Sequence, residues 1–69
     1  MNAERLSACL ETLGWGEVEL SFQTDIAIST VRKWAFGRDP IPPAIAAWLE
    51  DLAAYHEAHP VPARREVVR

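Results

Sequence analysis

The chain has 69 residues and a net charge of −3, from ten acidic and seven basic side chains, and 49% of its residues are hydrophobic. This length favours one domain, and the apolar content supports a core and argues against bulk disorder. The acidic total disfavours a uniformly basic nucleic-acid coat. Since no apolar run approaches the roughly 18 residues of a membrane helix, no membrane span is expected.

The cysteine usage and the N-terminus indicate the compartment. Cys9 is the single cysteine, so an internal disulfide is excluded, and a reducing compartment or an inert buried thiol is indicated. The first residues include Glu4 and lack the apolar core of a secretory signal. We therefore expect a cytoplasmic protein.

Residues 3–13 are expected to form an amphipathic helix. Four apolar side chains recur at the helical spacing i, i+3, i+4, i+7: Leu6, Cys9, Leu10 and Leu13. Asn2 is a suitable N-cap and Gly14 a suitable C-terminal stop. Trp15 then follows as a buried plug between this helix and the next.

A second helix is expected over residues 17–24. Leu20 faces inward, and either Thr24 or Phe22 accompanies it.

A turn at residues 25–27 directs Ile26 into the core, and a third helix follows over residues 28–36. Its inward face carries three side chains at helical spacing, namely Ile28, Val31 and Trp34.

Gly37 and Pro40 end the third helix, because glycine stops a helix and proline forbids its continuation. The clearest helix follows over residues 43–58. Pro42 and Pro43 suit its first turn, where a missing amide donor costs nothing. Its apolar stripe comprises Ile45, Trp48, Leu49, Leu52 and Tyr55 or His56.

The folded domain is expected to span residues 1–60. Residues 61–69 are predicted to form a tail without a core of its own, mobile or docked on a partner. Its three arginines, Arg64, Arg65 and Arg69, are either an arm that follows phosphates or a solubilising tail.

Charge is unevenly distributed along the chain. Residues 1–31 contain five acids and one base, residues 32–38 contain three bases and no acid, and residues 39–57 contain four acids and no base. The last six residues form a second basic segment. If the fold brings it and residues 32–38 to one face, a local positive patch forms despite the acidic total.

In this order and spacing, the residues resemble small lambda-repressor-like (Cro-type) helix-turn-helix proteins, over roughly residues 5–59. The matching pieces are Leu13-Gly14-Trp15, Glu19-Leu20, Thr30-Val31-Arg32-Lys33-Trp34, Gly37, Ile41-Pro42-Pro43 and Ala47-Trp48-Leu49. The resemblance implies an all-α, compact four-helix domain, with the helix-turn-helix at residues 17–36 and a closing helix at 43–58. It further implies a bacterial, sequence-specific DNA-binding transcriptional regulator that acts as a homodimer on double-stranded DNA.

By position in the resembling motif, the DNA-binding set is Ala27, Ile28, Ser29, Thr30, Arg32, Lys33 and Arg38. Arg32 is the candidate for a bidentate contact to guanine, and Lys33 for a contact to guanine or phosphate. Ser29 and Arg38 would lie on phosphates, and Ala27 or Ile28 would meet a thymine methyl group.

The chain departs from the family pattern at the binding end of the motif. Glu17 replaces the usual glutamine, and its carboxylate would repel phosphates unless it points aside. Asp25 replaces the glycine that favours positive φ, at moderate cost. Thr24 stands where leucine is usual, whereas Ser21 keeps the small residue at the helix contact.

The N-cap of the third helix is left open by the sequence. Ala27 stands where a polar cap is usual, and losing a side-chain cap costs about 1 kcal/mol. A later start capped by Ser29, or an earlier one capped by Asp25, would avoid that loss.

A second interpretation is a protein-interaction module that keeps the fold. Glu17, Glu19 and Asp25 would form an acidic face for a basic partner, such as a DNA-binding protein or the transcription machinery. Phe22 and Phe36 would then be anchors; otherwise they belong to the peripheral core.

The last helix offers a dimer interface, because a large aromatic side chain at a core's rim is often an anchor. The candidates are Trp48, Leu52 and Tyr55. His56 and His59 lie three residues apart but have no further ligand nearby, so no metal and no cofactor is expected. Since no catalytic arrangement or glycine-rich phosphate loop is present, the chain is not expected to be an enzyme.

Overall fold

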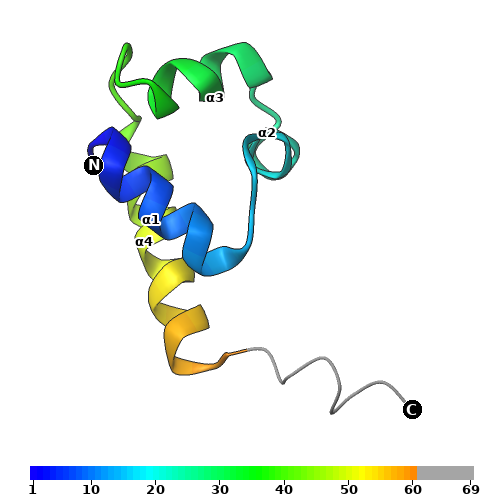
Figure 1. Cartoon of the computed structure of the whole chain (residues 1–69), viewed down its shortest axis with the longest axis vertical. Coiled ribbons are helices and arrows are strands. Elements are labelled where there is room, and N and C mark those ends of the chain that lie inside the picture. The colour runs from blue at the N-terminus through cyan, green and yellow to red at the C-terminus, as the bar shows by residue number, and fades with distance from the viewer. Residues whose placement is uncertain (61–69) are drawn as a thin grey trace.

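Four helices and no strands make up residues 1–60, the part of the chain that the computed structural model describes (Figure 1). The helices are α1 (Ala3–Leu13), α2 (Glu17–Thr24), α3 (Ile28–Ala35) and α4 (Pro43–Ala58). The prediction of a compact all-α domain with four helices is confirmed. The predicted basic tail at 61–69 lies outside the described residues.

Both ends of α1 have the caps that the sequence predicts. The side-chain Oδ1 of Asn2 accepts a hydrogen bond from the backbone N–H of Arg5 at 2.8 Å. At the other end, Gly14 adopts a left-handed conformation with φ of 74°, and its N–H donates to Glu11 O. Because Gly14 has no Cβ, it adopts this conformation without the usual steric cost.

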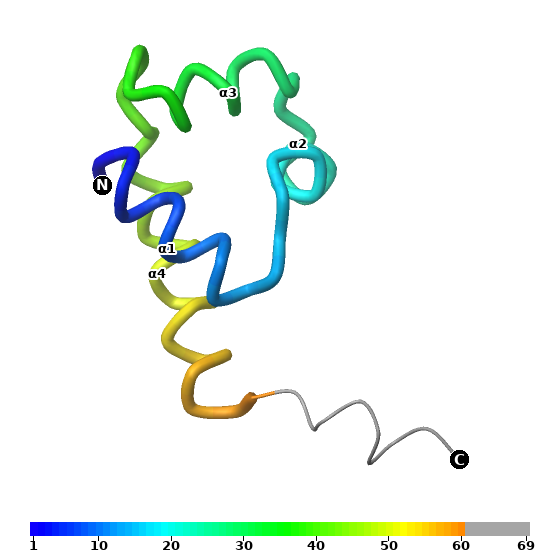
Figure 2. Tube along the Cα trace, viewed as in Figure 1, coloured from blue at the N-terminus to red at the C-terminus, as the bar shows by residue number. Residues whose placement is uncertain are grey.

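One core joins all four helices, with α1 packed against both α4 and α3, and α2 against α3 (Figure 2). Its buried residues are Leu6, Cys9, Leu10, Leu20, Val31, Trp34, Ile41, Leu49 and Ala53. Cys9 is buried, and burial raises the pKa of its thiol, which lowers its reactivity. Ile41 and Ala53 belong to this core, although no apolar stripe predicted them.

Trp15 is half-buried, so its predicted role as a buried plug is only partly correct. Its ring lies 5.8 Å from that of Trp48, between centroids, with the planes tilted by 47°. Both tryptophans pack against the core, where their tilted ring contact adds to the apolar burial.

α4 has the predicted bounds. Pro43 is its first residue and Pro42 its N-cap. Of its predicted stripe, Leu49 is buried, while Ile45, Trp48, Leu52 and His56 are half-buried and Tyr55 is exposed. None of the described helices has the length and apolarity needed to cross a membrane.

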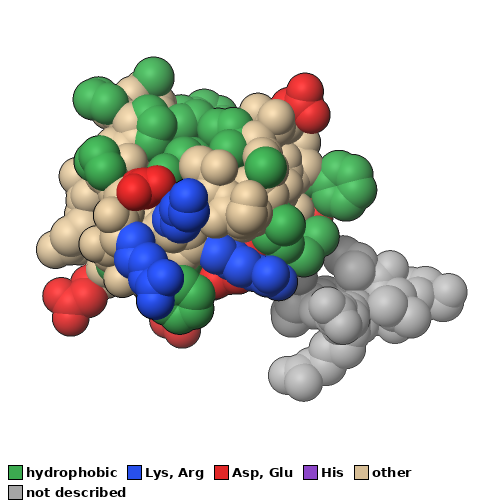
Figure 3. Space-filling view, turned by 90° about the horizontal axis from the view of Figure 1, so that it is seen from above, with side chains coloured by type: hydrophobic (Ala, Val, Ile, Leu, Met, Phe, Trp, Pro, Cys, Tyr) green, Lys and Arg blue, Asp and Glu red, His purple; other side chains and the backbone are tan. Residues whose placement is uncertain are grey.

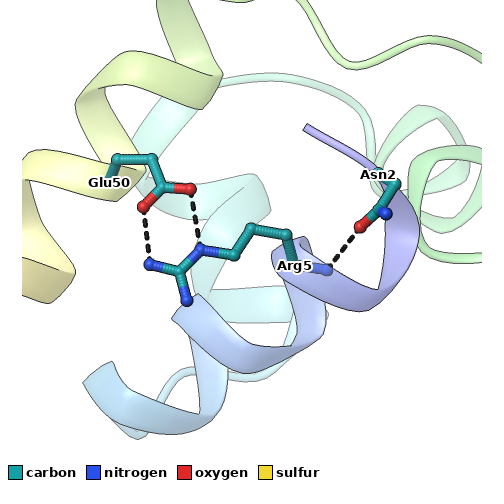
Figure 4. Close-up of polar contacts among 3 residues, drawn as sticks. All are labelled: Asn2, Arg5 and Glu50. Atoms are coloured by element: carbon teal, nitrogen blue, oxygen red, sulfur yellow. Dashed lines mark hydrogen bonds and ion pairs between the residues drawn. The ribbon is translucent and has the colours of Figure 1, made fainter.

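A bidentate ion pair links α1 to α4 across the surface (Figure 4). The Nε of Arg5 donates to Glu50 Oε2 at 2.7 Å, and its Nη2 donates to Oε1 at 2.6 Å. These hydrogen bonds lower the pKa of the Glu50 carboxyl group. The pair links the two helices at their solvent-exposed edge.

Candidate nucleic-acid interface

α2 and α3 are joined by a turn of residues 25–27, as the sequence predicts. Asp25 has φ of 58°, the left-handed conformation expected there, and Ile26 is half-buried against the core. The Ser21 hydroxyl donates to the carbonyl oxygen of Ile26 at 2.6 Å. This hydrogen bond ties the end of the turn back to α2 and so sets the approach of α3.

Of the two alternatives for the inward side of α2, Thr24 is correct. Thr24 is half-buried and its Oγ1 donates to Leu20 O at 2.8 Å, whereas Phe22 is 79% exposed. The Thr24 hydroxyl thus stands where the resembling proteins usually have a leucine side chain. Its hydrogen-bonding capacity is met by a backbone carbonyl of the same helix.

Ala27 is the N-cap of α3, with no hydrogen bond from its side chain. Neither alternative cap applies, because Ser29 lies within the helix and Asp25 is the C-cap of α2. α3 ends at Ala35, one residue before the predicted end, and the Phe36 N–H donates to Arg32 O. No side chain therefore caps the first turn of α3, where the Thr30 N–H donates to Ala27 O at 3.0 Å.

The two sides of α3 differ sharply. Val31 and Trp34 are buried, and Ile28 is half-buried beside them. The predicted DNA-binding set lies toward solvent, with Ala27, Ser29, Arg32, Lys33 and Arg38 exposed and Ile28 and Thr30 half-buried. Figure 3, which looks down on α2 and α3, shows Lys and Arg side chains gathered in one area of the surface.

The segment after α3 folds back on the end of that helix. The backbone N–H of Arg38 donates to Lys33 O at 2.8 Å, and Gly37 permits this reversal with φ of 72°. The guanidinium carbon of Arg38 lies 6.0 Å from the centroid of the Phe36 ring. The fold therefore keeps Arg38 beside the basic end of α3.

Glu17 does not project freely from the start of α2. Its Oε1 accepts a hydrogen bond from the Nε of Arg32 at 3.4 Å, which joins the first turn of α2 to α3. From the sequence, this carboxylate would repel phosphates unless it points aside. It points at the arginine predicted to read DNA.

The acidic face of α2 is smaller than the sequence suggests, because Glu17 is paired with Arg32. Glu19 accepts a hydrogen bond from Gln23 Nε2 at 2.8 Å, and Asp25 is exposed. Beside them is a hollow of about 500 Å³, lined by Val18, Ser21, Phe22, Asp25, Ile26, Ala27 and Ile28.

Phe22 and Phe36 are 79% and 72% exposed, so neither belongs to the peripheral core. They lie at separate hollows, since Phe36 borders one of about 390 Å³ between α1 and the end of α3. The two rings therefore border different parts of the surface.

The dimer candidates on α4 have unequal surroundings. Trp48 contacts Trp15 in the same chain, and Leu52 is half-buried. Tyr55 is exposed and stacks on His59, with ring centroids 4.3 Å apart. Within residues 1–60, no three His, Cys, Asp or Glu side chains gather in a way that could hold a metal ion.

Two features of this region were not predicted from the sequence, namely the Ser21–Ile26 hydrogen bond and the Glu17–Arg32 ion pair. The charges at positions 17 and 32 are opposite, but 15 residues separate them. Only the angle between the helices brings them together.

No protein-family model, curated protein or solved structure matches this chain. Its function is therefore inferred from its own residues.

Proposed function

We propose that this chain is a sequence-specific DNA-binding transcriptional regulator, with α2 and α3 as a helix-turn-helix and α3 as the helix that enters the major groove. The observation that carries the proposal is the division of α3 into two sides. Val31 and Trp34 anchor one side in the core, while Arg32 and Lys33 project from the other. A recognition helix needs this combination of a fixed inner face and an exposed, basic outer face.

The exposed residues are suited to two kinds of DNA contact, to base edges and to phosphates. Arg32 would bind guanine through O6 and N7, while Lys33 would bind guanine or phosphate. Ser29 and Arg38 would hold phosphates and so fix the register of the helix. Ala27 and Ile28, at the N-terminal end of α3, would approach a thymine methyl group.

One α3 offers few base contacts, so useful affinity needs two copies. We propose a homodimer on half-sites about 34 Å apart, one turn of DNA. Tyr55, with Leu52 and Trp48 behind it on α4, provides the candidate interface, and the exposed Tyr55 ring is its most accessible part. The reducing cytoplasm is the compartment that this function and the buried Cys9 thiol fit.

The test starts from random duplex DNA, from which the full chain selects its site. Fluorescence anisotropy on the selected and a scrambled duplex then gives both affinities at about 50 and 200 mM salt. Arg32→Ala should weaken specific binding by about 1–3 kcal/mol and relax one base preference. Lys33→Ala should weaken binding to the selected duplex, with a loss on scrambled DNA as well where the contact is to phosphate.

Arg5→Gln is the matched control, because it removes one positive charge on α1, at the pair with Glu50. It should leave base preference unchanged. Failure to enrich any sequence with a folded protein would refute the proposal, as would Arg32→Ala that binds like the wild type.

A second candidate is a protein-interaction module, favoured by the exposed Val18 and Phe22 beside Asp25. In that case Phe22→Ser and Asp25→Lys should abolish binding of a basic partner, whereas Arg32→Ala should leave it intact. A folded chain that enriches no DNA sequence but shows this pattern would support the second candidate.

A further inference from the structure

We propose that Glu17 is a specificity-determining residue of the α3 surface, which holds Arg32 for base contact and weakens binding to DNA that lacks the preferred base. The inference rests on the proposed function, since it concerns how the same surface distinguishes one sequence from another. It is carried by the contact between the Glu17 carboxylate and the Arg32 guanidinium.

The geometry of this contact leaves the base-reading part of Arg32 free. Glu17 Oε1 accepts from Nε, on the inner edge of the guanidinium group, at 3.4 Å. Within residues 1–60, the guanidinium of Arg32 has no other hydrogen-bond acceptor. Nη1 and Nη2 therefore remain as a two-pronged donor of the kind that binds O6 and N7 of guanine.

The electrostatics of the pair act against indiscriminate binding. Non-specific affinity comes from phosphate contacts by lysine and arginine, and a carboxylate beside Arg32 cancels much of the field of that arginine at the DNA backbone. The hydrogen bonds to guanine depend on donor geometry and persist when the guanidinium is paired. Glu17 should thus lower affinity for every sequence, but least for the sequence that places guanine at Arg32.

The Glu17–Arg32 ion pair is expected to contribute little to the stability of the fold. The side chains of Arg32 and Glu17 are 57% and 38% exposed, and exposed ion pairs contribute little to folding. An effect of Glu17 on DNA binding is therefore separable from an effect on stability.

Glu19 provides a matched control on the same helix. Both glutamates lie in the first turn of α2, so a change to glutamine removes the same charge from the same helix end. Glu19, however, bonds to Gln23 on its own helix rather than to α3.

The experiment compares Glu17→Gln with Glu19→Gln on the selected and the scrambled duplex over a range of salt concentrations. Glu17→Gln should tighten binding to scrambled DNA about fivefold, which corresponds to the ~1 kcal/mol between two unit charges 4 Å apart in water. The salt slope on scrambled DNA should steepen by about 0.9, for one further phosphate contact. Binding to the selected duplex should tighten less, so the specificity ratio falls.

Glu19→Gln should leave the specificity ratio near the wild-type value. In an Arg32→Ala background, Glu17→Gln should no longer change the ratio, because Glu17 acts through Arg32. Melting curves of each variant show that the compared proteins are folded.

The outcomes separate the inference from the function on which it rests. If the wild type discriminates but Glu17→Gln keeps or raises the specificity ratio, or matches Glu19→Gln, the role of Glu17 is refuted and DNA recognition stands. If the wild type binds both duplexes equally or not at all, the proposed function fails, and the role of Glu17 fails with it.

Discussion

At the scale of single residues, the turn between α2 and α3 depends on two polar side chains. Asp25 takes the left-handed conformation, which costs a non-glycine residue free energy, although aspartate tolerates it better than most. The Ser21 hydroxyl donates a hydrogen bond to the half-buried carbonyl oxygen of Ile26, at the end of the turn, over 2.6 Å. Together they turn the chain through three residues without the glycine usual in this position of the resembling family.

Ser21→Ala should destabilise the domain, because it removes the donor to the Ile26 carbonyl. The expected cost is about 1 kcal/mol, slightly reduced by the better helix propensity of alanine. For a domain of this size, that loss lowers Tm by about 4–8 °C, which thermal unfolding followed by circular dichroism would measure.

Ser7→Ala is the control for this prediction, since Ser7 is an exposed serine on α1. It should leave Tm unchanged or slightly raised. Equal melting temperatures for the two variants would show that the Ser21 hydroxyl does not stabilise the turn.

The conformation of Asp25 could be anticipated from the family resemblance, but the role of Ser21 could not. The sequence indicated only that a small residue was needed at position 21 for helix contact. Whether its hydroxyl finds an acceptor depends on where the turn places the Ile26 carbonyl, which is a tertiary property.

At the scale of whole elements, the helices follow from local sequence. Capping by Asn2 and Gly14, and proline at the start of α4, set boundaries that agree with the predicted ones. The pairing of helices is different, because it relies on contacts between distant residues. Arg5 and Glu50 are 45 residues apart, yet their bidentate bond links α1 to α4.

This ion pair should make stability depend on pH in the acidic range. Arg5 lowers the pKa of Glu50 in the folded state below its usual value of 4.5. A carboxyl group with a depressed pKa stabilises the fold above its unfolded pKa, and that contribution is lost as pH falls through the folded value. The loss should therefore begin near pH 4.5 and be complete below the folded pKa of Glu50.

Glu50→Gln isolates this contribution. At pH 7 the wild type should melt above Glu50→Gln, and the gap should narrow as pH is lowered from about 5 to 3. Thermal melts of both proteins across this range measure the gap. A difference in Tm that stays constant down to pH 3 would show that the pair does not couple α1 to α4.

At the scale of the whole molecule, α1 is the central element, because it packs against both α4 and α3. Trp34 supplies the bulk of the core on the α3 side and is only 3% exposed. The core of a domain this small rarely supplies more than about 3–5 kcal/mol of net stability. Loss of the core would therefore also abolish the proposed DNA-binding surface.

Trp34→Ala should largely unfold the protein. Removing a buried tryptophan costs about 3–5 kcal/mol, comparable with the whole stability of the domain. Circular dichroism at 25 °C should show loss of most helical signal. Trp15→Ala, which removes a half-buried tryptophan, should stay folded with a lower Tm. Melting of Trp34→Ala within a few degrees of the wild type would contradict this account of the core.

The sequence by itself determined the all-α class, the four helices and most of the apolar side of each, because caps, prolines and hydrophobic spacing act over a few residues. It also placed Arg32 and Lys33 outside the core, since the spacing of Val31 and Trp34 defines the buried side of α3. Only the tertiary structure decided that Glu17 faces Arg32 and that Phe22 and Phe36 border separate hollows. Those relations depend on the angles at which helices pack, and such angles result from contacts between residues far apart in the chain.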